Sequence, residues 1–231
     1  MEKFVKYLKS DTNVGNQFVH NIMKQNYENQ EYWEEVIPLL LFSDPKVEKY
    51  VLENIEIFNL KYLIKYAHEL TNKIIDYILL NINLLDDYND LITYQRLIPQ
   101  QILEFIEKIG IDKVNWKLLQ EYQYLTQEFI TKYQIYIDWD LISEYQFMDL
   151  KFLVVNKSKI NWELVASNTQ LQPIMNESFI KFFADTNIWD GIGYIENLDI
   201  DTINKYSEYL TPKSYKSIEL ARTLIEELSD S

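Results

Sequence analysis

Apolar residues recur along this chain at a spacing that favours short helices over strands. Between residues 115 and 188, aliphatic and aromatic side chains fall three and four positions apart, as on one face of a helix. The arrangement returns after a fixed interval, because Trp116, Trp139 and Trp162 are each separated by 23 residues. A constant interval of this length is typical of repeat arrays. The pattern therefore predicts repeated helical units.

Each copy shares one frame, counted from the tryptophan. Asn or Asp precedes it, two aliphatic residues take the second and third places after it, and Leu or Met takes the ninth. The sixth and seventh places are Tyr-Gln in the first two copies and Asn168-Thr169 in the third. The Asx residue predicts an N-cap, because its side-chain oxygen can accept from free N–H groups of the first turn. Thr126 and Asp149, directly after the ninth place, predict the cap of a second helix in the same unit. Helices this short are unstable alone, so neighbouring units must stack.

Looser copies extend the array on both sides. Lys61 and Tyr88 are predicted to stand in the tryptophan position of two earlier copies, and Trp189 leads a later one. The later copy contains Gly191 and Gly193, each of which weakens a helix by about 1 kcal/mol. We therefore predict an all-α fold, a short α-solenoid of paired short helices with a repeat of about 23–28 residues and atypical N- and C-terminal caps.

The chain contains no Gly/Ser-rich or Pro-rich linker, so a single domain over 1–231 is predicted. Residues 1–57 form an N-terminal cap and a loose unit led by Trp33, 58–210 form the repeats, and 211–231 form a C-terminal capping helix. In the N-terminal cap, Phe4, Val5 and Leu8 give the apolar face before a capping cluster at residues 10–13; in the final helix it is given by Ile218, Leu220, Ala221, Leu224, Ile225 and Leu228. The repeat anchors, which we expect to pack between layers, are Trp116, Trp139, Trp162 and Trp189.

The Tyr-Gln pairs admit two interpretations. Tyr122, Gln123, Tyr145 and Gln146 recur where each first helix is predicted to end. The amides could bond neighbouring turns as a ladder, or the four residues could form an exposed row that a partner binds. The structural role is favoured, and the interaction row stays open as the alternative.

Composition narrows the class of protein. A hydrophobic fraction of 47% with 15% aromatic residues excludes a disordered chain, and the absence of cysteine excludes disulfides, thiolate metal sites and cysteine nucleophiles. The N-terminus interleaves charges and predicts no signal peptide, and the longest apolar run, Val36 to Phe42, is far too short to cross a bilayer. We therefore expect a soluble, cytoplasmic protein without membrane association.

Candidate chemistry is outweighed by structural roles. The two histidines, His20 and His68, lack a metal-binding or nucleophile motif, and a Gly-rich phosphate loop is missing. Asp138 with Asp140 could in principle serve as acid and base, but the frame already gives Asp138 a capping role. The other carboxylate pairs are Asp86-Asp87 and Glu34-Glu35, and Asp87 is likewise predicted to cap a helix. We therefore predict no catalytic, cofactor-binding or metal-binding residue and no cofactor.

Charge bears on the partner. The net charge is −14, from 36 acidic and 22 basic residues, and the sequence has no cluster of Lys and Arg that would hold a phosphate backbone. Nucleic-acid binding is therefore not expected, and Lys151, Lys157 and Lys159 are the best candidates for an exception. The acidity is explained by solubility, or by imitation of nucleic acid toward a basic partner.

The frame, best preserved at 115–125 and 138–148, resembles the short Trp-anchored helical repeats of uncharacterised giant DNA virus proteins over about residues 58–210. The resemblance implies an all-helical scaffold and a viral source, hence host cytoplasm or virion, and it carries no activity. The leading functional prediction is a non-enzymatic protein–protein interaction or scaffold module with a protein partner, a second copy of the chain included. The alternative is an acidic inhibitor that mimics nucleic acid and blocks a basic enzyme.

Overall fold

The computed structural model describes residues 13–196 and 198–229, and within these ranges all secondary structure is helical. The predicted all-α, solenoid-like class is confirmed: short helices contact their neighbours in sequence order. Contacts divide the chain into two compact units, 1–124 and 125–231, which are described separately. The predicted single domain stays a prediction, and Phe4, Val5 and Leu8 lie outside the described residues.

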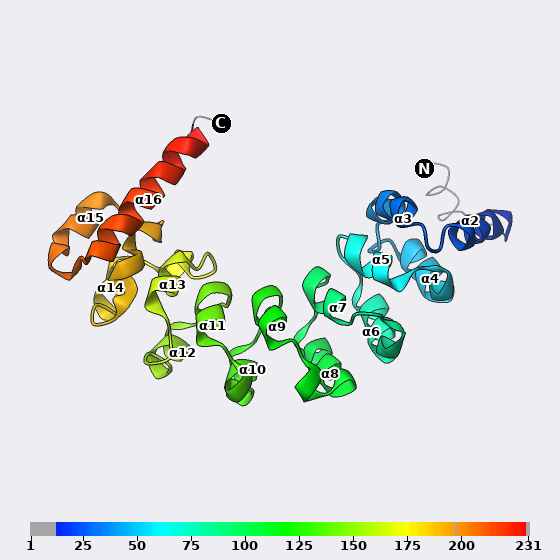
Figure 1. Cartoon of the computed structure of the whole chain (residues 1–231), viewed down its shortest axis with the longest axis horizontal. Helices are drawn as coiled ribbons and strands as arrows, with labels where there is room; N and C mark the ends of the chain where they lie inside the picture. Colours follow the sequence, from blue (N-terminus) through cyan, green and yellow to red (C-terminus); the bar gives the residue numbers. More distant parts are fainter. Residues whose placement is uncertain (1–12, 197, 230–231) are drawn as a thin grey trace. The chain divides into compact units, whose positions relative to one another are not determined.

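Unit 1 contains two rows of helices (Figure 1). In one row α3 contacts α5, α5 contacts α7 and α7 contacts α9; in the other α4 contacts α6 and α6 contacts α8. Each repeat thus contributes one helix to each row, which is the predicted helix pair. The elements are α2 (Asn13–Gln25), α3 (Gln30–Val36), η1 (Ile37–Leu39), α4 (Pro45–Glu53), η2 (Ile55–Ile57), α5 (Leu60–Tyr66), α6 (Asn72–Leu80), η3 (Ile82–Leu84), α7 (Asn89–Tyr94), α8 (Pro99–Ile109), η4 (Ile111–Lys113) and α9 (Trp116–Tyr122).

Unit 2 continues the pairing and ends on a longer helix. Here α11 contacts α13, α13 contacts η7, and η7 packs against α16 (Figure 1). The elements are α10 (Gln127–Lys132), η5 (Gln134–Tyr136), α11 (Trp139–Tyr145), α12 (Leu150–Val155), α13 (Trp162–Ser167), η6 (Gln172–Ile174), α14 (Glu177–Phe182), η7 (Asn187–Tyr194), α15 (Ile200–Lys205), η8 (Ser207–Tyr209) and α16 (Pro212–Ser229).

The predicted caps start the helices of the repeats. The Asn115 side chain accepts from the Leu118 N–H, and Asp138 accepts from the Asp140 N–H. Each such bond satisfies a donor that the first turn of a helix leaves free. The same bond is made at the predicted second-helix caps Thr126 and Asp149, and at Asp199 at the start of α15.

A further recurrent feature closes the second helices. Asn54, Asn81 and Asn156 occupy the C-caps of α4, α6 and α12, and each side-chain amide donates to the carbonyl four residues earlier, at 2.8–3.0 Å. At Asn81 and Asn156 this bond gives the carbonyl a second donor, because the backbone N–H of the same asparagine bonds to it as well. At Asn54 the backbone N–H bonds to Val51, and the side chain supplies the donor for the carbonyl four residues earlier. A short turn then redirects the chain to the next first helix, through η2 and η3 in unit 1.

The three equally spaced tryptophans hold equivalent places, because α9, α11 and α13 each begin at one of them. Trp162 is fully packed: its Nε1 donates to the Lys157 carbonyl at 3.0 Å, and its ring centroid lies 4.2 Å from that of Phe183. Trp116 and Trp139 are only partly buried. The ninth place is more uniformly buried, at Leu97, Leu125, Met148 and Leu171.

Two earlier assignments need correction. The first helix of the early copy begins at Leu60, one residue before the predicted Lys61, whose side chain is exposed. The copy led by Trp189 replaces the expected α-helix by the 3-10 helix η7. Its two glycines have a packing role that the helix-propensity argument missed, since both lie against neighbouring elements.

Those glycines let η7 lie close to its neighbours. A Cβ on Gly191 would stand 2.7 Å from the Ala166 Cβ of α13, and one on Gly193 would stand 2.5 Å from the Ser217 carbonyl oxygen of α16. Ser217 is buried there, whereas the predicted apolar residue Leu220 is exposed. The inner face of α16 is therefore partly built from small polar residues, contrary to the apolar face expected from the sequence.

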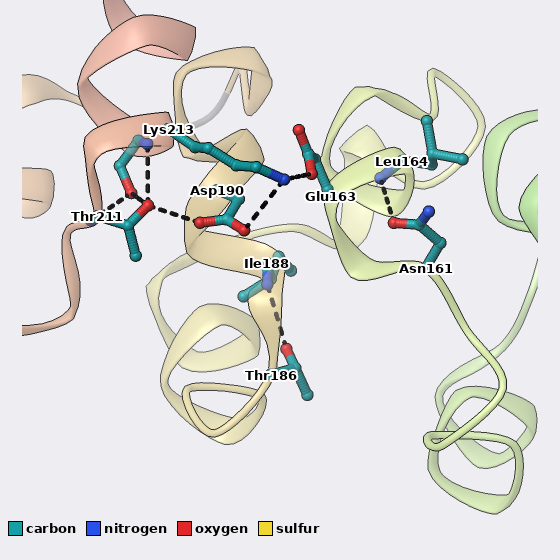
Figure 2. Close-up of polar contacts among 9 residues, drawn as sticks. Asn161, Glu163, Leu164, Thr186, Ile188, Asp190, Thr211 and Lys213 are labelled. Atoms are coloured by element: carbon teal, nitrogen blue, oxygen red, sulfur yellow. Dashed lines mark hydrogen bonds and ion pairs between the residues drawn. The ribbon is translucent and has the colours of Figure 1, made fainter.

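Polar contacts complete this C-terminal packing (Figure 2). The Lys213 ammonium lies 2.8 Å from a Glu163 oxygen of α13 and 3.8 Å from an Asp190 oxygen of η7. The Thr211 hydroxyl donates to Asp190 at 2.6 Å and also accepts from the Ser214 N–H, which caps α16. The start of the last helix is thus tied to two preceding elements of unit 2.

Candidate interaction surfaces

A buried amide joins successive repeats of unit 1. Gln95 follows α7, and its Nε2 donates to the carbonyls of Ile64 and Ala67 at 2.7 and 3.0 Å. Its Oε1 accepts from the Leu70 N–H at 2.9 Å. One side chain therefore satisfies three backbone groups at the end of the preceding first helix, where the helix itself leaves carbonyls free.

Gln123 repeats this geometry one unit later. Its Nε2 donates to the carbonyls of Ile92 and Gln95 at 2.6 and 2.7 Å, and its Oε1 accepts from the Leu97 N–H at 2.9 Å. The recurrence at one place in the frame gives the ladder that the sequence suggested, and Gln95, absent from the predicted row, belongs to it.

Unit 2 contains the same kind of bond. Gln146 Oε1 accepts from the Leu125 N–H at 2.9 Å, and Asn168 Nδ2 donates to the carbonyls of Ser143 and Gln146, each at 2.9 Å. Helix α13 is one residue shorter than α11, so Asn168 occupies the place of the glutamine and its shorter side chain still reaches. Its Oδ1 accepts locally, from the Gln170 N–H.

The ladder decides between the two interpretations of the Tyr-Gln pairs. Gln123 and Gln146 are only 3% and 1% exposed, so these amides do not belong to a surface row. Their backbones are extended, with φ near −105° and ψ near 150°. Successive side chains of an extended segment point in opposite directions, so Tyr124, directly after Gln123, points outward and is 47% exposed. Tyr122 and Tyr145 are the last residues of α9 and α11; Tyr122 is 48% exposed and Tyr145 is partly exposed.

We call the links between first and second helices the loop edge, comprising 37–44, 67–71, 95–98 and 123–124 in unit 1, and 125–126, 146–149 and 168–176 in unit 2. In unit 1 large side chains are exposed along it or directly beside it. Leu39 and Leu41 border a hollow of about 640 Å³ that His68 and Thr71 also line. Further along the edge the exposed residues are Tyr94, Ile98, Tyr122 and Tyr124.

Unit 2 carries a more apolar hollow of about 470 Å³ between successive links of its loop edge. Phe147 and Leu150 line one side, and Ile174, Phe179 and Phe182 line the other. Leu150 and Phe182 remain 51% and 59% exposed although both are large and apolar. A contiguous patch of exposed apolar side chains on a folded protein is typical of a surface that contacts a partner.

A third hollow lies where second helices pass to the next first helices of unit 1. This turn-edge groove has a volume of about 440 Å³, and its lining comes from 27–28, 55–64 and 77–90. Its apolar part includes Phe58 and Leu85. Its charged lining consists of five carboxylates and one lysine: Glu28, Glu56, Asp86, Asp87, Asp90 and Lys61.

The carboxylates of this groove affect one another. Burial, and then the neighbouring Asp87 carboxylate, raise the pKa of Asp90 above its usual range, although Lys61 and Lys65 act in the opposite direction. Asp87 lies one residue before Tyr88, which takes the N-cap position of α7 in place of the predicted Asp87, and its Oδ1 accepts from the Asn89 N–H at 2.8 Å.

The remaining candidate residues are not brought together as a reactive site. His20 lies in α2, whereas His68 lies in the link after α5. Asp138 caps α11, and Asp140 accepts from the Asn161 amide at 2.9 Å. Within 13–196 and 198–229, no group of three or more acidic or histidine residues is placed to hold a metal ion.

The three lysines proposed as an exception do not form a basic groove. Lys157 pairs with Asp185, and Lys159 Nζ lies 4.9 Å from the Trp139 ring centroid and donates to Gln134 at 3.3 Å. Lys151 is exposed on α12. Two of the three positive charges are therefore already engaged within unit 2.

Comparison of the chain with protein-family models, curated proteins and solved structures gives no match. The likeness to giant-virus repeats stays a prediction. None of the helices in the described part of the chain combines the length and apolar character needed to cross a membrane. Function is therefore argued from the surfaces above.

Proposed function

We propose that this protein is a non-enzymatic interaction scaffold that binds a partner protein through its loop edge. The observation that carries the proposal is the alternation beside the buried amides: the glutamine points inward, and tyrosines such as Tyr122 and Tyr124 point outward. Exposed aromatic side chains on a rigid backbone suit recognition, because aromatic residues dominate binding energy at protein interfaces.

The ladder supports this proposal energetically. Gln123 anchors its own link to the end of α7 and to the link that follows it, through bonds to Ile92, Gln95 and Leu97. A surface ordered before binding loses less conformational entropy when the partner arrives. The loop edge thus combines apolar contact area with preorganisation.

A protein is a better-matched partner than nucleic acid. The net charge of −14 repels phosphate, and lysines such as Lys157 and Lys213 already lie against carboxylates. Carboxylates that could serve as catalytic acids or bases, such as Asp138 and Asp140, are engaged in caps and cross-repeat bonds. A viral source and a cytoplasmic location remain part of the proposal.

The test is site-specific photo-cross-linking in extracts of the native source. A photoreactive amino acid replaces Ile98 or Tyr124, which are exposed on links of the loop edge, and the matched controls are Leu80 and Val155, which are exposed and apolar but lie at the ends of second helices. We expect one protein to be cross-linked from the loop-edge positions and not from the controls.

Purified partner should then bind the wild-type chain and lose about tenfold in affinity with the Tyr122→Ser/Tyr124→Ser double variant. Equal cross-linking from all four positions, or unchanged affinity of the double variant, would refute loop-edge binding.

A further inference from the structure

The turn-edge groove of unit 1 combines two chemistries within one hollow. Phe58 is buried at its base, while Leu84 is 63% exposed at its border, and three tyrosines line it as well. Five carboxylates share the same lining with a single lysine. An apolar base beside carboxylates that outnumber the nearby lysines matches the chemistry of a long basic side chain, whose stem is apolar and whose head is charged.

The lysine in the groove does not balance these carboxylates. Lys61 Nζ lies 5.9 Å from the Tyr62 ring centroid, and its side chain is exposed. Asp86 and Asp87 are adjacent in sequence, and Asp90 follows one helical turn after Asp87. Like charges this close repel, so an added cation lowers the electrostatic energy of the groove.

Unit 2 shows how the equivalent place in the frame accepts a cation. Counted from the C-cap asparagines Asn81 and Asn156, the third residue of the following turn is Leu84 in unit 1 and Lys159 in unit 2. The Lys159 ammonium lies over the Trp139 ring at 4.9 Å and bonds to a side chain of the preceding turn at 3.3 Å. Cation–π attraction and hydrogen bonding thus hold an ammonium group at this junction between repeats.

In unit 1 that internal lysine is replaced by leucine, while tyrosines and added carboxylates surround the junction. A metal ion is a poorer match for this groove, because among the described residues no three acidic or histidine side chains are placed to ligate one ion. Nucleic acid is repelled by the same carboxylates. A polypeptide with spaced positive charges satisfies both the apolar base and the acidic lining.

We propose that the turn-edge groove binds a Lys- or Arg-containing segment of a partner protein, with a basic side chain lying along Leu84 and Leu85 and its head among Asp86, Asp87 and Asp90. This inference rests on the proposed function, since it assumes a protein partner, but it assigns a second surface with its own recognition chemistry. Charge complementarity supplies the specificity.

The test uses the full chain and a fluorescently labelled peptide of alternating lysine and serine, followed by anisotropy, with a glutamate–serine peptide as the probe control. The groove variant is Glu56→Gln/Asp86→Asn/Asp90→Asn, which leaves the capping Asp87 in place. The matched control variant, with the same charge change on exposed residues of unit 2, is Glu128→Gln/Asp201→Asn/Glu208→Gln. Far-UV circular dichroism checks that both variants remain folded.

We expect the groove variant to bind the lysine peptide about tenfold more weakly and the control variant to lose less than about twofold. Equal loss of affinity in both variants would mean that the whole acidic surface attracts cations, as in a nucleic-acid mimic, and would refute a specific groove site. Absence of peptide binding by the wild-type chain would refute it as well. Failure here with loop-edge cross-linking intact refutes the groove alone. Groove binding without loop-edge cross-links refutes the loop edge alone.

Discussion

Replacing Gln123 by alanine tests whether the amide ladder holds the repeats together. The change removes three hydrogen bonds of 2.6–2.9 Å from a side chain that is 3% exposed. The Leu97 N–H loses its acceptor, and the carbonyls of Ile92 and Gln95 each lose a donor. An unsatisfied buried polar group costs about 1–3 kcal/mol, and the carbonyls retain part of their bonding capacity, so we expect a total loss of about 3–5 kcal/mol.

A glutamate at the same position separates bonding from packing. Gln123→Glu keeps the shape and the acceptor for Leu97, but at neutral pH its carboxylate faces two carbonyl oxygens without a donor. Burial and this repulsion raise the folded-state pKa of the new carboxyl above its unfolded value of about 4.3. The destabilisation is therefore full above the folded-state pKa and shrinks as pH falls through it, because protonation restores one donor.

The assay is urea denaturation followed by circular dichroism, together with hydrogen exchange of the Leu97 amide. Gln100→Ala, on an exposed position of α8, is the matched control and should change stability by less than about 0.5 kcal/mol. If Gln123→Ala costs no more than this control and the Leu97 amide exchanges at the wild-type rate, the ladder does not carry the stability assigned to it. A Gln123→Glu penalty independent of pH would contradict the donor argument.

Three further changes follow from the packing. Trp162→Ala should cost about 3–5 kcal/mol in urea denaturation and Trp139→Ala clearly less, because only the first ring is fully buried. Gly193→Ala should cost about 1–3 kcal/mol and expose α16 to protease, since the new Cβ would overlap its backbone. The hydrogen bond from Lys205 lowers the pKa of Glu177 in the folded state. The stability that this carboxylate contributes is therefore present above its unfolded pKa and is lost as pH falls through the lowered value. Glu177→Gln should accordingly flatten the acidic limb of the stability–pH curve.

The sequence predicted the helical units well because their signals are local. An Asx cap, an aliphatic pair and a fixed interval act within one turn, and Asn115, Asp138 and Asn161 form the caps assigned to them. Degenerate copies were placed less well: Lys61 lies one residue inside α5, since the frame there lacks both the tryptophan and the Tyr-Gln pair. Where the local signal weakens, so does the register.

The fate of the Tyr-Gln pairs required tertiary information. Helical periodicity says nothing about a residue after the last turn, and Gln123 points inward only because its backbone is extended. A usable signal existed, since an amide repeated beside helix ends can satisfy the free carbonyls there. The role of Gly193 was misjudged for the same reason. A helix-propensity scale treats this glycine as destabilising, whereas the close approach of α16 leaves no room for a larger residue.

The turn-edge groove was beyond sequence reasoning because its lining spans residues 27–90 across successive repeats. Of these residues, the sequence singled out only the carboxylate pair Asp86-Asp87, in which Asp87 was predicted to cap a helix. Stacking then brings Glu28 and Glu56 to the same hollow, although each is unremarkable in its own segment. Non-local juxtaposition of this kind follows from the array and cannot be read from any one copy.

Stability and recognition are assigned to alternate residues of the loop edge. Because an extended link sends successive side chains to opposite faces, Gln123 serves the fold while Tyr124 faces outward, and Tyr122 is exposed at the end of α9. Substituting the tyrosines should therefore change stability by less than about 0.5 kcal/mol each. A chain built this way can alter what it binds without altering how its repeats stack. Any loss of partner binding by the double tyrosine variant can then be attributed to the surface itself, provided that its urea midpoint matches that of the wild type.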